Sequence, residues 1–296
     1  MTPEATARTL LARAQRRTFA LPGRNVELAA LDWGGHGPLA LLHHANGFCK
    51  GLWGLVAEAL RARWRVVAID ARGHGDSSKP EGADAYAWDR FAEDLLAVAT
   101  QLRRESGAPL ALGIGHSFGG TAMIGAAARA GDLFARLLLV DPVIPPPPPV
   151  LAGRQGVDRL VEGALRRRAE WPSRQAAREW CAQRPFFAAW QPEAIELYLL
   201  DGMDERADGS LVLKCPGAIE GAVFAGSTEL DIFARAGHVV TPTLLLWAER
   251  GDFPRAVHEA IAGVMADARV ETVACGHLVP MERPDAVVEA VERFAT

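Results

Sequence analysis

The residues of this chain that are best suited to chemistry surround Ser117. Residues 113–120 read Gly-Ile-Gly-His-Ser-Phe-Gly-Gly, so Gly115 and Gly119 lie two positions before and after the serine. The apolar run before this motif predicts a short buried strand, and the small residues after it predict a helix. A serine in such a turn is held in a strained backbone conformation that exposes its hydroxyl. We therefore predict that Ser117 is a nucleophile. We also predict that positions 115 and 119 must be glycine, because the turn leaves no room for a side chain there.

A serine hydroxyl is a weak nucleophile until a positioned base removes its proton during attack. Among the eight histidines, His277 is the best candidate, because it lies in a Gly-His turn just past the last expected strand, residues 269–273. His43 and His44 lie at the end of another expected strand, where a histidine usually has a structural role, although we expect His44 to border the pocket. His277 is therefore the predicted general base.

Three further segments accompany the serine motif. They are residues 41–48 (Leu-Leu-His-His-Ala-Asn-Gly-Phe), 66–80 (Val-Val-Ala-Ile-Asp-Ala-Arg-Gly-His-Gly-Asp-Ser-Ser-Lys-Pro) and 275–284 (Cys-Gly-His-Leu-Val-Pro-Met-Glu-Arg-Pro). With these four segments in this order, the chain resembles the α/β-hydrolase fold family over nearly its whole length. The segments are similar to the family's His-Gly loop, its Arg-Gly-His-Gly-x-Ser loop, and its catalytic-histidine loop with the helix that follows. The resemblance implies an α/β fold with a mostly parallel central sheet and helices on both faces.

The resemblance also implies a catalytic acid that falls between the serine and the histidine in the sequence. Asp252 is the expected acid, because it follows the expected strand 243–247, where most of the family carries this residue. The loop departs from the commoner form, since Asp252 lies three residues after Glu249 and Gly251 fills the usual position. Asp141, just after the expected strand 136–140, is the alternative acid that some members use.

An acyl-transfer site also needs backbone donors for the oxyanion of the tetrahedral intermediate. The N–H of Phe118, directly after the nucleophile, is one predicted donor. The strand-three loop supplies the other, and we expect Asn46, although the chain has His-Ala-Asn where the family usually has His-Gly-x. The family uses the positions of His74 and His116 for loop structure and packing.

Strands and helices alternate along most of the chain, which predicts a mainly parallel sheet. The expected elements are strands 18–20, 26–33, 39–43, 65–69, 110–115, 136–140, 243–247 and 269–273, and helices 7–17, 85–104 and 284–294. The alternation breaks at residues 143–235, which open with five prolines at 145–149. In the resembled family a helical cap is inserted at this point, so the core domain would comprise residues 1–142 and 236–296. We expect two or three of the seven aromatic residues in this segment to face substrate: Trp171, Trp180, Phe186, Phe187, Trp190, Tyr198 and Phe224.

Composition limits the partners. The chain has 296 residues, 49% hydrophobic, with a formal net charge of −4, which fits neither nucleic acid nor an anionic membrane surface as a partner. It has no continuous apolar stretch typical of a signal peptide or a membrane span, so we expect a cytoplasmic monomer or homodimer acting on a small molecule. Its four cysteines (Cys49, Cys181, Cys215 and Cys275) lie far apart, which predicts free buried thiols; we expect no metal and no cofactor.

These features favour a serine hydrolase that cleaves small apolar carboxylic esters through an acyl-enzyme. A carbon–carbon bond hydrolase or a lactonase with the same triad is an alternative within enzymes. A weakly catalytic ligand-binding protein on the same fold is a third possibility, which turnover of a chromogenic ester would separate from the first two. Epoxide hydrolases and haloalkane dehalogenases need an aspartate at the elbow, and Ser117 argues against both.

Overall fold

A central eight-stranded sheet organises the molecule. The computed structural model describes residues 1–82, 84–145, 154–227 and 230–295. The strand order is β1-β2-β4-β3-β5-β6-β10-β11, in which β1 pairs antiparallel with β2, β2 antiparallel with β4, and all later neighbours are parallel. The strand bounds are β1 (Gln15–Leu21), β2 (Val26–Asp32), β3 (Leu39–His43), β4 (Arg65–Ile69), β5 (Leu112–His116), β6 (Leu137–Val140), β10 (Thr243–Ala248) and β11 (Ala268–Val273). The mostly parallel sheet predicted from the sequence is confirmed.

Helices cover both faces of this sheet, because successive strand residues point to opposite sides. In β4, Val67 and Ile69 join the apolar core on one side, while Val66 and Ala68 join the core on the other. The first side is covered by α3 (Trp88–Ser106), α4 (Phe118–Arg129), α9 (Ile232–Ala236) and α10 (Arg255–Val264), and the second by α2 (Gly54–Leu60) and α12 (Pro284–Ala295). A short α11 (Val279–Glu282) precedes α12.

The N-terminal helix differs from the expected range 7–17. It is α1 (Pro3–Arg13), and Arg16 and Arg17 lie on β1 instead. The Thr2 side chain accepts a hydrogen bond from the Ala5 N–H, and a proline occupies the first helical turn, so the helix begins earlier than its apolar spacing indicates.

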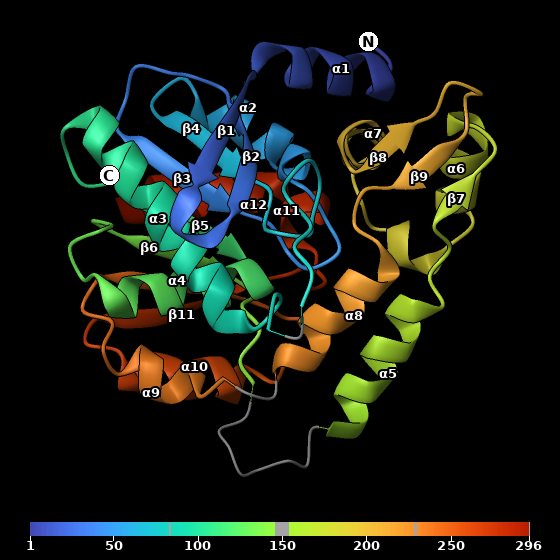
Figure 1. Cartoon of the computed structure of the whole chain (residues 1–296). Coiled ribbons are helices and arrows are strands. Elements are labelled where there is room, and N and C mark those ends of the chain that lie inside the picture. The colour runs from blue at the N-terminus through green and yellow to red at the C-terminus, as the bar shows by residue number, and fades with distance from the viewer. Residues whose placement is uncertain (83, 146–153, 228–229, 296) are drawn as a thin grey trace.

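Between β6 and β10 the chain builds a separate layer beside the sheet, and we call residues 154–226 the insertion (Figure 1). Its elements are α5 (Arg154–Leu165), β7 (Glu170–Trp171), α6 (Arg174–Ala182), α7 (Pro192–Asp201), β8 (Met203–Glu205), β9 (Leu211–Leu213) and α8 (Gly217–Gly226). The segment is thus not purely helical, since β7, β9 and β8 form a small antiparallel sheet. A turn with Gly209 at φ 82° makes that hairpin possible. Of the five prolines, only Pro145 lies among the described residues.

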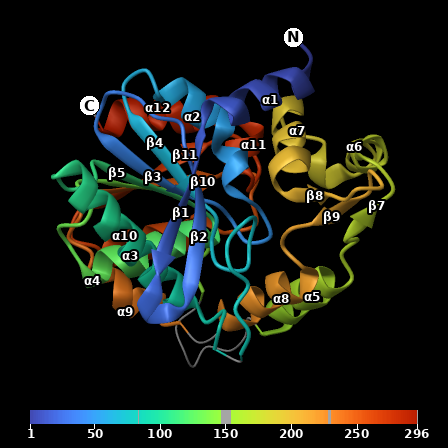
Figure 2. The same ribbon diagram turned by 45° about the horizontal axis from the view of Figure 1, so that its top comes forward.

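The insertion packs on the core through α7 and Trp190. In Figures 1 and 2, α5 and α8 lie side by side below the small sheet, and α7 packs beside α1. Phe48 and Leu278 of the core belong to the same apolar cluster as Trp190 and Leu197 of the insertion. The insertion therefore faces the loops at the carboxyl ends of the sheet strands, where ligands bind in open α/β sheets.

Two further expectations concern the described ranges. All four cysteines are buried and free, as predicted. Within the described ranges, no helix is both long enough and apolar enough to cross a membrane.

Candidate active site

Ser117 lies in the turn between β5 and α4, with its backbone in the left-handed region at φ 56° and ψ −124°. The turn is tight on both sides. A Cβ at Gly115 would lie 2.4 Å from the carbonyl oxygen of Gly119, and one at Gly119 would lie 2.5 Å from that of His43. Both glycines are therefore required by close backbone approach, as the sequence predicts. The strain holds the serine side chain at the carboxyl edge of the sheet.

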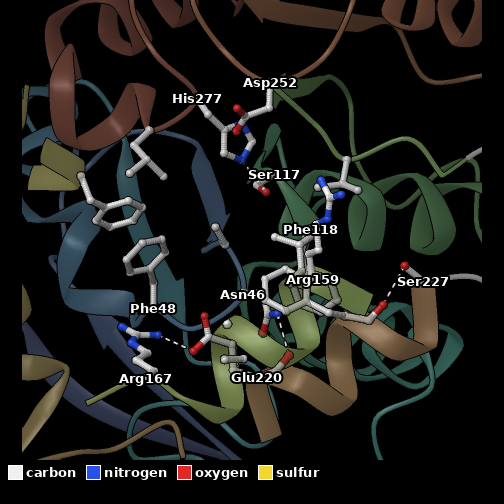
Figure 3. Close-up of a pocket in the computed structure, with 18 of the residues that line it drawn as sticks. Asn46, Phe48, Ser117, Phe118, Arg159, Arg167, Glu220, Ser227, Asp252 and His277 are labelled. Carbon is white, nitrogen blue, oxygen red and sulfur yellow. Dashed lines mark hydrogen bonds and ion pairs between the residues drawn. The ribbon is translucent and has the colours of Figure 1, made fainter. Parts of the chain in front are cut away.

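His277 lies between the serine and a carboxylate. Its Nε2 is 2.9 Å from Ser117 Oγ, and its Nδ1 is 2.6 Å from Asp141 Oδ2. An ionised carboxylate can only accept, so Nδ1 carries the proton and Nε2 accepts from the serine hydroxyl. Figure 3 shows the His277 ring directly beside Ser117. This arrangement matches a nucleophile, a base, and an acid that holds the tautomer of the base.

Asp141 reaches this position because its strand neighbours the strand of the serine. In the pairing of β5 with β6, His116 lies opposite Val140, so Ser117 and Asp141 are the next residues at the same sheet edge. Asp141 has φ 41°, and its Oδ1 accepts from the Ala248 N–H at 3.0 Å.

The carboxylate of Asp141 is fully buried. Burial alone would raise its pKa, but the neighbouring His258 and His277 hold this pKa at about 2. The His258 Nε2 lies 3.4 Å from the Asp141 Oδ1. Asp141 is therefore ionised throughout the neutral pH range, as a partner of an imidazolium must be.

The expected partner of His277, Asp252, is not the one that the structure provides. Asp252 is exposed, lines the cavity described below, and makes no hydrogen bond or ion pair with another described residue. The neighbouring Phe253 contacts the imidazole instead, with ring centroids 5.3 Å apart. The reason is the geometry of the turn after β10. A Cβ at Gly251 would lie 2.9 Å from Asp141 Oδ2, so a side chain at position 251 would press on the Asp141 carboxylate, whereas Asp252 lines the cavity.

The predicted oxyanion donors, Phe118 and Asn46, both line the cavity together with Ser117. Phe118 opens α4, so its N–H has no helical carbonyl to bond. In the described parts of the chain, neither backbone N–H has an acceptor. The Asn46 side chain donates to the Glu220 carbonyl of α8 at 3.0 Å, which ties this loop to the insertion (Figure 3).

The other histidines near the site have structural bonds. His44 Nε2 accepts from the Ala71 N–H at 3.0 Å, and His74 Nε2 accepts from the Gly47 N–H at 3.1 Å. His116 Nε2 donates at 2.9 Å to the carbonyl of His277 and thereby anchors the loop of the base. These contacts match the structural roles expected for them.

Buried neutral histidines predict that the protein loses stability in mild acid. Burial lowers the pKa of His43 and of His74 to about 4 and that of His116 to about 3, and it lowers the pKa of His44 well below its usual value. In the unfolded chain these groups bind protons at about pH 6.5. Between that pH and about 4, the unfolded state therefore holds more protons, and the free energy of unfolding falls as the pH falls. Each such histidine lowers it by up to about 1.4 kcal/mol per pH unit.

Asp70 has the opposite effect on stability, because burial raises its pKa to about 6 and the folded state therefore holds the extra proton below that pH. Urea unfolding at pH 7, 6 and 5 measures the net slope. Replacing the exposed His238 by glutamine should leave the slope unchanged. Stability that is constant or higher at pH 5 would contradict the burial of neutral histidines.

A cavity of about 920 Å³ opens beside Ser117, between the core and the insertion. Asn46, Phe118, Asp252 and His277 lie on its core side (Figure 3). Six of the seven insertion aromatics line it, more than the two or three expected: Trp171, Trp180, Phe186, Phe187, Tyr198 and Phe224. The cavity wall is therefore mainly apolar and rich in aromatic rings, and most of the rings of the insertion also pack on one another.

Sequence reasoning missed the polar residues of this wall. Arg167 forms an ion pair with Glu220 and donates to the Tyr198 hydroxyl, and the three side chains line the cavity beside Phe48. Arg159 of α5 lines it as well. The abundance of arginine in the insertion was the available signal, but the sequence does not tell which arginines turn inward.

Comparison with known proteins now places the chain in a family. A model of the alpha/beta hydrolase family matches residues 40–290. The chain belongs to this family. The hydrolase is 29% identical over 270 residues to the N-formylmaleamate deformylase of Pseudomonas putida, an alignment that covers 89% of this chain and 91% of that protein.

A second relative is a type I acyl-CoA thioesterase of Penicillium brevicompactum, 32% identical to the hydrolase over 137 residues, which are 46% of this chain and 29% of that protein. The hydrolase thus spans only about a third of the length of its thioesterase relatives. Among solved structures, E-2-(acetamidomethylene)succinate hydrolase superposes with a TM-score of 0.81 at 22% identity, covering 95% of this chain and 98% of that one. This last likeness concerns the fold.

Proposed function

We propose that the protein is a serine hydrolase that cleaves carboxylic esters through an acyl-enzyme, with Ser117, His277 and Asp141 as its triad. The observation that carries this proposal is the continuous hydrogen-bonded series from Ser117 Oγ through His277 to the buried Asp141, beside a large cavity. Membership in the hydrolase family supports the reaction class.

The geometry suits two successive acyl transfers. Ser117 Oγ attacks the acyl carbon while its proton passes to His277 Nε2, and Asp141 stabilises the imidazolium. The N–H groups of Phe118 and Asn46 are the proposed donors to the oxyanion. His277 then protonates the departing alcohol, and the same base activates a water molecule that hydrolyses the acyl-enzyme.

The aromatic wall supports a substrate with a sizeable apolar part. Each methylene buried against such a wall contributes about 0.8 kcal/mol, or about a fourfold gain in kcat/KM. With p-nitrophenyl esters of about two to twelve acyl carbons, a test range matched to a pocket of this kind, we expect kcat/KM to rise with chain length and then fall once the cavity is full. Initial-rate kinetics on this series provide the measurement. A flat profile would contradict an apolar acyl site, and an absence of turnover would favour a ligand-binding protein.

A thioesterase is the second candidate, and the acyl-CoA thioesterase relatives favour it. The same triad serves both reactions, because a thiolate is a better leaving group than an alkoxide and needs less help from His277. An oxygen ester and a thioester of the same acyl group, both with uncharged leaving groups, distinguish the two. A kcat/KM at least about tenfold higher for the thioester, which corresponds to 1.4 kcal/mol, would assign thioester hydrolysis.

A further inference from the structure

Seven of the eight arginines of the insertion whose side chains the structure describes have a partner, and two of these seven are Arg168, which donates to the Glu170 carbonyl, and Arg184, which stacks on Trp180. Five are paired with carboxylates: Arg166 with Glu162, Arg167 with Glu220, Arg174 with Glu205, Arg178 with Glu196, and Arg206 with Glu170. Arg159 differs, because its guanidinium makes no ion pair or hydrogen bond with any residue in the described ranges. It is exposed and lines the cavity beside Ser117. Its charge is therefore accessible to a ligand there.

The Arg159 side chain extends from α5 into the cavity, toward the part that holds Ser117 and Asp252 (Figure 3). A guanidinium placed there can reach a ligand in the cavity. Its planar array of donors matches a carboxylate or a phosphate in a bidentate arrangement.

The formal charges of the side chains that line the cavity sum to a positive value, which favours the binding of an anion. Three arginines line the cavity, Arg159, Arg167 and Arg184, against two carboxylates, Glu220 and Asp252. Glu220 is already bound to Arg167, and the Arg184 guanidinium stacks on Trp180 at 4.2 Å from the ring centroid. The wall is therefore net positive in a chain whose formal net charge is −4. A cationic cavity with low-dielectric aromatic walls attracts anions.

We propose that Arg159 binds an anionic group of the substrate, either a carboxylate on its acyl part or a phosphate on its leaving group, while the aromatic wall holds its apolar part. This inference rests on the hydrolase function proposed above and narrows its substrate class. Arg159 is then a specificity-determining residue that acts on substrate binding, with no part in proton transfer.

Two matched substrate pairs test the proposal and distinguish the two anions. The first pair is p-nitrophenyl hexanoate and the mono-p-nitrophenyl ester of adipic acid, which differ by a terminal carboxylate. The second is the pantetheine thioester and the 4′-phosphopantetheine thioester of hexanoic acid, which differ by one phosphate on the leaving group. We expect the charged member of one pair to have at least about a tenfold higher kcat/KM, through a lower KM, in low salt.

Arg159→Gln should remove the preference for the charged member and leave kcat/KM for the neutral member within about twofold of the wild-type value. Arg159→Lys should retain part of the preference, because lysine keeps the charge without the planar donors. Arg166→Gln is the matched control, because Arg166 lies near the end of the same helix but is paired with Glu162. Equal losses on both members of a pair, or the same loss in Arg166→Gln, would overturn the proposal. Equal kcat/KM for the two members of both pairs would overturn the role of Arg159 but leave the hydrolase function standing. An absence of turnover with all four substrates would overturn the hydrolase function as well.

Discussion

Replacing Ser117 by alanine should lower kcat for ester hydrolysis by about 10⁴–10⁶-fold while the fold remains intact. The substitution removes the Oγ that lies 2.9 Å from His277 Nε2, and no other hydroxyl among the described residues hydrogen-bonds that nitrogen. It also leaves Gly115, Gly119 and the helix that follows unchanged. The residual rate should reflect the oxyanion donors and substrate binding alone. Steady-state kinetics with p-nitrophenyl butyrate provide the measurement.

Two controls make the Ser117→Ala result decisive. Circular dichroism and the melting temperature should match those of the wild-type chain, and Ser106→Ala, at an exposed serine at the end of α3, should retain full activity. A correctly folded Ser117→Ala protein with wild-type turnover would contradict the serine-hydrolase account.

Replacing Asp141 by asparagine should lower kcat by about 10⁴-fold, because the amide donates where the carboxylate accepts and stabilises the wrong imidazole tautomer. The matched variant Asp252→Asn should change kcat less than about tenfold, since Asp252 is exposed and makes no contact with the imidazole nitrogens. A large loss in Asp252→Asn with little in Asp141→Asn would reverse the assignment of the acid.

Position 251 offers a stricter form of this test. A side chain there would lie against Asp141 Oδ2, so Gly251→Asp alone should reduce activity by crowding the triad. In Asp141→Ala the space beside His277 Nδ1 is vacated, and adding Gly251→Asp should then recover at least about tenfold in kcat. A double variant that is no better than Asp141→Ala would show that the loop after β10 holds position 251 too far from the histidine.

The sequence predicted the elements that position the site, for reasons visible in the structure. Burial follows from the local spacing of apolar residues, so it can be predicted from the sequence. Examples are the apolar strands and the buried face of α3, which consists of Phe91, Leu95, Val98 and Leu102. The turn that holds Ser117 could be predicted equally well, because only glycine fits at positions 115 and 119.

The identity of the residue next to His277 Nδ1 was not predictable in the same way. Asp252 and Asp141 both follow sheet strands, and the choice between them depends on a turn. The Gly251 N–H donates to the Ala248 carbonyl at 3.0 Å, and this turn places position 251 against the Asp141 carboxylate. A glycine at 251 leaves space for Asp141 from the neighbouring strand. The absence of a side chain at that position was the signal in the sequence.

The number of insertion aromatics that line the cavity was underestimated for a related reason. Helical spacing identifies an apolar face but does not tell whether that face meets a core or a cavity. Of the six aromatics that line the cavity, five also pack on another ring of the insertion, as Phe187 and Trp180 do on each other. Only the three-dimensional arrangement of the insertion over the sheet edge reveals this.

Covalent labelling with diethyl p-nitrophenyl phosphate tests the central claim most directly, because the reagent phosphorylates only an activated nucleophile. Peptide mapping by mass spectrometry should find one diethylphosphoryl group, on Ser117, with release of one equivalent of p-nitrophenol. The labelling rate should fall by at least about 10³-fold in Asp141→Asn and stay within about tenfold of wild type in Asp252→Asn. Labelling of another residue, or equal rates in the wild-type chain and Asp141→Asn, would contradict a Ser117–His277–Asp141 triad.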